Sequence, residues 1–247
     1  MHEEEVKPLG YEELEDKRVV ILQSGGLDSN VIASVFKYYG FEMHHIFINY
    51  GQNMLEKERE YSKKIAEYYG GTYQEVTLDL PWLHSTTSLV GHIVDDTHET
   101  EGQFNANLTG AYVPLRNQML LSIAGSYAEA LEIPYIACAF DGAEDENHVP
   151  TGGTTDKHPT FVRKIEDSLN EGSAFHHIKG NNFTILTPIM NLYKHDIIGL
   201  GLVAEADMSL SWSCYNKADK PCGQCSACKL RAEAFELLEL EDPALCQ

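Results

Sequence analysis

The sequence is poor in basic residues and has no long apolar run. Both absences limit the classes of partner that the protein can have. Only 18 Lys and Arg stand against 38 Asp and Glu, so the formal charge at pH 7 is −20. Nucleic-acid affinity rests mainly on phosphate neutralisation by basic side chains, so this charge predicts no nucleic-acid partner. No apolar run approaches the roughly 18 residues that span a bilayer, and the first residues lack a secretory signal pattern. We therefore expect a cytoplasmic protein with no membrane partner.

The length and composition are those of a globular chain with one large domain and a small appendage. The chain has 247 residues, of which 43% are apolar, and can bury a full core. The first 16 residues carry seven acids and one Lys, which is typical of a solvated extension. We expect an acidic extension over 1–17, a main domain over 18–205 and a C-terminal lobe over 206–247.

From residue 19 onward, short β-branched runs alternate with longer amphipathic segments. This alternation is typical of a parallel sheet flanked by helices. The expected strands are 19–23, 43–49, 74–78, 135–140 and 183–186. The expected helices are 29–39, 55–69, 117–131, 159–170, 194–200 and 225–240. Two irregular stretches, 81–111 and 141–159, are long enough to favour a functional role. The sequence thus predicts an α/β fold with a doubly wound parallel sheet.

A glycine-rich turn follows the first expected strand and opens the first expected helix. Its residues are Ser24-Gly25-Gly26-Leu27-Asp28-Ser29. Two glycines let backbone N–H groups approach an anion, and the helix N-terminus adds partial positive charge. The turn lacks the Gly-Lys-Ser/Thr end of a Walker A loop and the spacing of a dinucleotide fingerprint. It indicates a different phosphate cradle, with an ordinary strand-to-helix turn as the alternative.

Four of the six cysteines lie close together near the C-terminus: Cys214, Cys222, Cys225 and Cys228. Their spacing, C-x7-C-x2-C-x2-C, suits four thiolates around one tetrahedral zinc ion, a closed site without a catalytic water. A group of buried thiols and an iron–sulfur cluster are the alternatives. Cys138 lies in an apolar run and is expected in the core, and Cys246 is expected in the tail.

The glycine-rich turn resembles the pyrophosphate loop of N-type ATP pyrophosphatases, which split ATP into AMP and pyrophosphate while adenylating a substrate oxygen. That family usually has Ser or Thr after the second Ser, where this sequence has Asn30, whose amide can still donate to a phosphate oxygen. Further motifs follow in order between Val19 and Pro243: Gly51-Gln52, Val113-Pro114-Leu115-Arg116-Asn117, Trp212-Ser213-Cys214-Tyr215 and Pro221-Cys222-Gly223-x-Cys225-x-x-Cys228. Together these motifs resemble the 7-cyano-7-deazaguanine synthase (QueC) family.

This resemblance implies an adenine-nucleotide α-hydrolase-like fold with an ATP pyrophosphatase domain over 18–205 and a zinc-binding lobe over 206–247. The implied enzyme is an AMP-forming carbon–nitrogen ligase of queuosine biosynthesis. It adenylates the carboxylate of 7-carboxy-7-deazaguanine, captures ammonia as an amide, and dehydrates the amide to 7-cyano-7-deazaguanine (preQ0). The implied cofactors are ATP, Mg²⁺ and Zn²⁺. Because relatives are homodimers, we expect a homodimer.

The resemblance also assigns roles to individual residues. The implied catalytic residues are Ser24, Asp28, Arg116 and Lys194. The implied ATP-binding residues are Ser24, Gly25, Gly26, Leu27, Asp28, Ser29, Asn30, Gly51, Gln52, Arg116 and Asn117. The implied substrate-binding residues are Asp141, Asp156, Pro159, Phe161 and Trp212. The implied zinc ligands are Cys214, Cys222, Cys225 and Cys228.

Simpler roles stay open for four of these residues. Asp28 either helps to hold magnesium or caps its helix. Arg116 forms either a bidentate phosphate contact or a surface ion pair. Lys194 either contacts the sugar-phosphate end of the nucleotide or is a solvated helix residue. Trp212 either packs at the edge of the nucleobase site or anchors the zinc loop.

The sequence departs from the family pattern beside the expected substrate. The family loop Gly-Tyr-Pro-Asp-Cys-Arg-Pro-x-Phe corresponds to residues 153–161, where Lys157 and His158 replace the Cys and Arg. Residues 144–152 look like added length, and Asn49 replaces the usual Asp before Tyr50-Gly51-Gln52. An alternative product therefore stays open. As suggested by QueC-like relatives of phages and bacterial defence operons, the activated acyl group would be conjugated to an amine of a partner protein.

Two other classes of protein fit the sequence less well. A tRNA-thiolating ATP pyrophosphatase needs a basic RNA surface and a sulfur-carrying Cys, which the charge of −20 and the metal-like cysteine spacing oppose. A non-catalytic nucleotide-binding zinc module is the other class, and the intact loop over 24–29 together with Arg116 argues against it.

Overall fold

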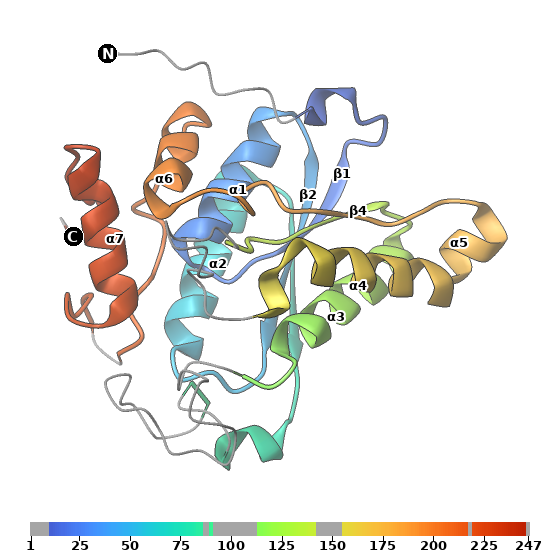
Figure 1. Cartoon of the computed structure of the whole chain (residues 1–247), viewed down its shortest axis with the longest axis horizontal. Coiled ribbons are helices and arrows are strands. Elements are labelled where there is room, and N and C mark those ends of the chain that lie inside the picture. The colour runs from blue at the N-terminus through green and yellow to red at the C-terminus, as the bar shows by residue number, and fades with distance from the viewer. Residues whose placement is uncertain (1–9, 86–88, 91–112, 142–154, 217–218, 246–247) are drawn as a thin grey trace.

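Five parallel strands form the central sheet in the order β3-β2-β1-β4-β5, and Figure 1 labels β1, β2 and β4. The computed structural model describes residues 10–85, 89–90, 113–141, 155–216 and 219–245. The strands are β1 (Arg18–Leu22), β2 (Glu42–Asn49), β3 (Thr72–Thr77), β4 (Tyr135–Ala137) and β5 (Thr184–Leu186). Val19 pairs with Met43 of β2 on one side and with Tyr135 of β4 on the other. The predicted α/β class with a parallel sheet is confirmed.

Helices cover both faces of this sheet (Figure 1). They are α1 (Leu27–Tyr38), α2 (Leu55–Tyr69), α3 (Arg116–Leu131), α4 (Pro159–Gly172), α5 (Ala174–Lys179), α6 (Lys194–Val203) and α7 (Ser226–Leu237). Short 3-10 turns occur at Tyr11–Glu13, Pro81–Ser85 and Thr155–Lys157. No helix within the described ranges is both long and apolar enough to cross a membrane.

The two faces of β1 contribute to different hydrophobic cores. Val19 and Ile21 pack with α1, α2, α6 and α7, whereas Val20 packs with α3, α4 and α5. Successive side chains of a strand point to opposite faces, and none of the three side chains is exposed. A strand buried on both faces needs an uninterrupted apolar run, which is why the sequence reads Val-Val-Ile here. The sheet is therefore doubly wound, as predicted.

The strand order creates a crevice at the carboxyl end of β1. The chain leaves β1 through α1 to reach β2 on one side, while β4 lies on the other side of β1. Ligands of open α/β sheets bind at such a switch point, outside the carboxyl ends of the strands. The turn after β1 and the loop after β4 both open into this region.

The structure differs from the sequence-based expectations at three places. Residues 174–179 form α5, which was not predicted, and β4 ends at Ala137 rather than at residue 140. Part of the expected solvated extension packs on the main domain, because the Tyr11 ring stacks on Phe36 with centroids 5.4 Å apart. Most of the irregular stretches 81–111 and 141–159, together with Cys246, lies outside the described residues.

Candidate active site and metal centre

The turn between β1 and α1 is held in shape by its own side chains. Gly25 has a φ of +78°, and a Cβ atom there would lie 2.5 Å from the backbone oxygen of Glu58 in α2, so glycine is required. The hydroxyl of Ser24 donates to Ser29 Oγ over 3.1 Å, and Gln23 Nε2 donates to the same oxygen over 2.9 Å. Helix α1 begins at Leu27, directly after this turn. The geometry suits an anion at this helix end.

Asn30 has a different place from the one that the loop motif suggests. Its side chain is fully buried, its Nδ2 donates to the Asp207 oxygen over 2.8 Å, and its Oδ1 accepts from the Tyr69 hydroxyl over 2.8 Å. Its backbone N–H is bonded to the oxygen of Gly26. Because its amide oxygen, its backbone N–H and one amide N–H are already bonded within the protein, we expect Asn30 to hold α1 against the C-terminal lobe rather than to contact a phosphate.

A chain of four charged side chains connects the loop after β1 with the loop after β4. Lys194, the first residue of α6, has its Nζ 2.7 Å from both carboxylate oxygens of Asp28. The same Nζ is 3.5 Å from Asp141 Oδ2, and Asp141 also forms an ion pair with Lys157. Asp28 and Lys194 are 166 residues apart in the sequence. Two carboxylates and two ammonium groups thus converge at the switch point.

Burial and charge act in opposite directions on this ion chain. Burial works to lower the pKa of Lys194, but Asp28 and Asp141 outweigh it, so the pKa is raised. Burial works to raise the pKa of Asp141, but Lys157 and Lys194 outweigh it, so that pKa is lowered. Both groups are therefore held in their charged forms, as a site for phosphates and a divalent cation requires.

A cavity of about 250 Å³ lies at the carboxyl ends of β1, β2 and β4. Its apolar wall includes Leu22, Ile46, Ile48, Leu120 and Phe140. Its polar lining includes Ser24, Gln52, Glu58, Arg116, Asn117 and Lys157. An apolar wall with a few convergent polar groups is the usual form of a site for a small ligand.

Arg116 enters this cavity from the first turn of α3. The preceding residue, Leu115, has a φ of +50°, an uncommon conformation for a side chain of this size. Burial opposes the charge of Arg116, but Tyr50, Asp156 and Glu58 raise its pKa. Asp156 Oδ1 is buried and, within the described residues, accepts no hydrogen bond. A fixed cation thus lines the cavity, and an acceptor without a hydrogen bond in the described part of the chain lies within range of its charge.

The motif after β2 forms a tight turn at the cavity rim. Gly51 has a φ of +84°, and its N–H donates to Asn49 Oδ1 over 3.0 Å. The Asn that replaces the family's Asp therefore supplies the same acceptor oxygen. Gln52 is buried, with its Oε1 accepting from the Tyr50 N–H over 2.9 Å. These contacts fix the direction of the Gln52 amide.

The structure separates three predicted substrate-binding residues from this cavity. Pro159 is the exposed first residue of α4, where its missing N–H costs nothing. Phe161 packs against the core formed by α3 and α4. Trp212 is 5% exposed and packs beside the cysteine cluster. Two other residues predicted for substrate are linked to the cavity by their partners. Asp141 pairs with Lys157, Asp156 acts on the charge of Arg116, and both Lys157 and Arg116 line the cavity.

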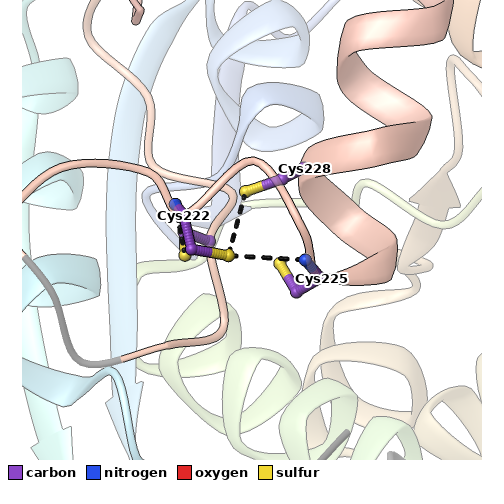
Figure 2. A group of neighbouring side chains, drawn as sticks. Cys222, Cys225 and Cys228 are labelled. Carbon is purple, nitrogen blue, oxygen red and sulfur yellow. Dashed lines mark hydrogen bonds between the residues drawn. The ribbon is translucent and has the colours of Figure 1, made fainter. Parts of the chain in front are cut away.

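The four clustered cysteines converge at the N-terminus of α7, and their sulfur atoms all lie within 4.8 Å of one another. Figure 2 shows Cys222, Cys225 and Cys228 turned toward one another. With zinc–sulfur bonds of 2.3 Å, two sulfurs of a tetrahedral site are about 3.8 Å apart. Cys222 and Cys228 already have their sulfurs 4.0 Å apart. The arrangement fits one tetrahedral metal ion.

Backbone N–H groups around two of the sulfurs support the same reading. The N–H groups of Asn216 and Cys222 point to the sulfur of Cys214 over 3.4 Å. Those of Gln224 and Cys225 point to the sulfur of Cys222, also over 3.4 Å. Burial acts to raise the pKa of Cys222, but these two N–H groups, together with the thiols of Cys214 and Cys225, outweigh it and lower the pKa to about 6. Donors aimed at a sulfur stabilise a thiolate, the form that binds metal.

Arg231 of α7 holds the chain on both sides of the cysteine cluster. Its guanidinium makes a bidentate contact with Asp242, with bonds of 2.8 and 2.9 Å. It also donates to Ser211 Oγ over 2.8 Å and to Ser213 Oγ over 3.1 Å. Both charged side chains are almost completely buried. This clamp, formed by Arg231 with Asp242, Ser211 and Ser213, fixes the segment that leads into Cys214.

Replacing Arg231 is expected to destabilise the protein strongly. Arg231→Met keeps most of the volume but leaves Asp242 buried without its cation, which costs about 3–5 kcal/mol in comparable buried pairs. Chemical denaturation measures the free energy of unfolding. Arg163→Met, at an exposed position of α4, is the control and should change it by about 0.5 kcal/mol or less. Equal stabilities of the two variants would contradict the clamp.

The cysteine lobe contacts the phosphate loop directly through Trp212. The backbone N–H of Trp212 donates to the oxygen of Gly25 over 2.9 Å. The indole Nε1 donates to the oxygen of Cys214 over 2.8 Å, and the ring packs against Tyr61 of α2. Between the two alternatives for Trp212, the geometry therefore favours the anchor of the metal loop.

Sequence reasoning missed Glu58, which lines the cavity. A signal was present, because Met54, Tyr61 and Ile65 are buried and Glu58 lies at helical spacing between the first two of them. A carboxylate on the buried face of an amphipathic helix is unusual and favours a functional role. The sequence shows that Lys157 departs from the family pattern, but only the tertiary structure shows that it pairs with Asp141.

A doubly wound sheet with a glycine turn and a charged cluster at its switch point defines a nucleotide-binding α/β protein. The family model described as "Queuosine biosynthesis protein QueC" matches residues 18–239. The chain belongs to the QueC family.

Curated relatives agree with this assignment. The chain is 34% identical to the 7-cyano-7-deazaguanine synthase of Methanosarcina barkeri over 240 residues, covering 92% of this chain and 97% of the relative. It is 34% identical to the enzyme of that name from Methanobrevibacter smithii, with the same coverage. The relative of that name from Sulfolobus acidocaldarius is also 34% identical, but only 47% of its length is matched.

Proposed function

We propose that the protein is a 7-cyano-7-deazaguanine synthase, an AMP-forming ligase that converts 7-carboxy-7-deazaguanine and ammonia into preQ0 at the expense of ATP. The observation that carries the proposal is the convergence of Asp28, Lys194, Asp141 and Lys157 beside the glycine turn. Family membership and the names of the relatives support the substrate. The proposed division is an ATP pyrophosphatase domain over 18–205 and a zinc lobe over 206–247.

The first step makes the carboxylate reactive. A carboxylate oxygen attacks the α-phosphorus of ATP, the bond to the pyrophosphate oxygen breaks, and an acyl adenylate forms. The charge that develops on pyrophosphate is stabilised by N–H groups of the turn at 24–29 and by the ammonium group of Lys194. Magnesium, when bound, adds positive charge to the leaving group, and Asp28 is the carboxylate that would hold it. Arg116 supplies a planar fork for a phosphate.

Two further steps lead to the nitrile. Ammonia attacks the acyl carbon, AMP leaves with the bonding electrons, and loss of a proton gives the amide. A second ATP adenylates the amide oxygen, and elimination of AMP with proton loss forms the carbon–nitrogen triple bond. Each nitrile therefore requires two ATP, and the protein's contribution in both activations is orientation and charge stabilisation.

The zinc lobe has a structural role in this proposal. A closed set of four thiolates leaves no position for a reacting water or substrate. A bound zinc supplies folding free energy to the lobe, and Cys214, Cys222, Cys225 and Cys228 are the residues that would hold it. A homodimer is proposed by analogy with relatives.

Product analysis tests the proposal. Incubation with ATP, magnesium, 7-carboxy-7-deazaguanine and ammonia should yield preQ0 and two AMP per nitrile, detected by mass spectrometry. Because Lys157, which pairs with Asp141, stands where the family has Cys, conjugation to a partner protein is the competing outcome. If AMP forms without nitrile and a partner protein gains the mass of the deazaguanine acyl group, the enzyme conjugates proteins instead. Absence of substrate-dependent AMP would overturn both versions.

A further inference from the structure

Glu58 is a carboxyl group that lines the cavity and has no role in the proposed nucleotide chemistry. It lies in the first turn of α2, four residues after the buried Met54. Its backbone oxygen faces Gly25 so closely that no Cβ would fit between them. The side chain therefore projects from a fixed point of the backbone beside the phosphate loop, and it lines a cavity that also has apolar lining residues.

The neighbours of Glu58 fix its carboxylate in one direction. Gln52 Nε2 donates to Glu58 Oε2 over 3.0 Å. The Gln52 amide cannot turn over, because its Oε1 accepts from the Tyr50 N–H and its Nε2 also donates to the oxygen of Ile48. In the described part of the chain, Gln52 is the side chain that donates to this carboxylate, so acceptor capacity is left toward the cavity.

Arg116 lines the same cavity and supplies compensating charge. Burial raises the pKa of Glu58, and the Gln52 hydrogen bond and the Arg116 charge act against burial. A carboxylate that is largely shielded from water and has few donors is costly, because its hydrogen-bonding capacity is not met. A ligand that brings two N–H groups would satisfy it.

The two purine-like rings of the proposed reaction differ at the edge that would meet this carboxylate. A guanine-type base presents two adjacent donors, the N1–H and the 2-amino group, which match the two oxygens of a carboxylate. Adenine presents the 6-amino donor next to N1, whose lone pair would face a carboxylate oxygen. An acceptor-only group therefore selects the guanine-type edge, because a mismatched buried polar edge is strongly disfavoured.

We propose that Glu58 recognises the N1–H and 2-amino edge of the 7-deazaguanine base, with Gln52 holding the carboxylate in position. This inference rests on the proposed function and names the residue that selects its substrate. The apolar wall formed by Leu22, Ile48 and Phe140 then covers a face of the ring. Ser24 and Lys157 line the same cavity and are left to contact the reacting carboxylate at position 7 of the base.

Calorimetric binding to the intact protein tests the inference. Glu58→Gln replaces one acceptor by a donor and should weaken binding of 7-carboxy-7-deazaguanine about 10- to 100-fold, the usual effect of losing a hydrogen bond to a charged group. Binding of a non-hydrolysable ATP analogue should change less than about twofold. Glu56→Gln is the matched control, because Glu56 lies in the same helical turn with its side chain 83% exposed and should leave both affinities unchanged.

A second measurement uses the unmodified protein and does not depend on the folding of a variant. The parent protein should bind 7-deazaguanine at least about tenfold more tightly than 7-deazahypoxanthine, which lacks only the 2-amino group. Equal affinities would overturn the inference. So would a Glu58→Gln variant that loses the ATP analogue but retains the deazaguanine base, because Glu58 would then belong to the adenine site.

The two proposals fail in different ways. If the parent protein discriminates 7-deazaguanine from 7-deazahypoxanthine but neither binds nor activates 7-carboxy-7-deazaguanine, the proposed reaction is wrong and the base recognition stands. If it activates the carboxylate and Glu58→Gln binds the substrate like the parent, the reaction stands and the inference is wrong. Failure to bind any deazaguanine overturns both.

Discussion

Asp28→Ala is expected to lower pyrophosphate release from ATP by about a thousandfold while leaving the protein folded. Asp28 is the first-turn carboxylate of α1, and both of its oxygens lie 2.7 Å from Lys194 Nζ. The substitution removes the group proposed to hold magnesium and frees Lys194 from the phosphate loop. Lys194 keeps Asp141 at 3.5 Å, so no buried charge is left without a partner. The loss should therefore appear in turnover rather than in stability.

Ser24→Ala tests the other end of the same loop. It removes the hydroxyl that donates to Ser29 Oγ and accepts from the Gly26 N–H, and a smaller loss of turnover is expected. Asp167→Ala, at an exposed site of α4, is the matched control for removal of an acid. Continuous pyrophosphate detection, with thermal unfolding as the check on folding, separates the outcomes. If Asp28→Ala and Ser24→Ala both keep the parent rate, the turn is structural and the assignment of the ATP site is wrong.

Loss of zinc is expected to unfold the C-terminal lobe and to weaken nucleotide binding together with it. Apparent free energies of zinc binding in small zinc peptides are about 10–16 kcal/mol, and these come from coupled folding. Cys222→Ser removes one of four converging thiols and should reduce metal content from one zinc per chain to well below one. The nucleotide effect is expected because the Trp212 N–H donates to the oxygen of Gly25.

Tryptophan fluorescence reports this coupling without an activity assay. The chain has two tryptophans, and Trp82 is 62% exposed whereas Trp212 is 5% exposed. A Trp82→Phe background leaves Trp212 as the single reporter, whose emission should shift to longer wavelength when a chelator removes the metal. The same treatment should weaken binding of a non-hydrolysable ATP analogue at least about tenfold, since linked equilibria are reciprocal.

A thiol control separates metal binding from loss of a cysteine. Cys246→Ser removes one thiol outside the cluster and should leave zinc content, Trp212 emission and nucleotide affinity unchanged. Cys222→Ser with full zinc content and unchanged stability would refute the metal site. A zinc-free protein that still binds nucleotide like the parent would show that the lobe does not position the phosphate loop.

The sequence alone determined the features that depend on neighbouring residues. The Val-Val-Ile run of β1, the glycine turn at 24–29 and the short cysteine spacings each act over a few residues, so the chain pattern reveals them directly. The same locality explains why the parallel sheet was predicted correctly, because strands buried on both faces require uninterrupted apolar runs. Recognition of the family rested on several such local motifs in a fixed order.

Only the tertiary structure decided which of these residues meet. The pairing of Asp28 with Lys194 joins positions 166 residues apart, and it exists because α1 and α6 pack on the same face of the sheet. The sequence could not show that Asn30 faces Asp207 and Tyr69, or that Trp212 reaches the phosphate loop. Nor could it show that Glu58 lines the cavity. A side chain's partners are set by the packing of whole helices on the sheet, and the periodicity of one segment carries no information about the segment that will cover it.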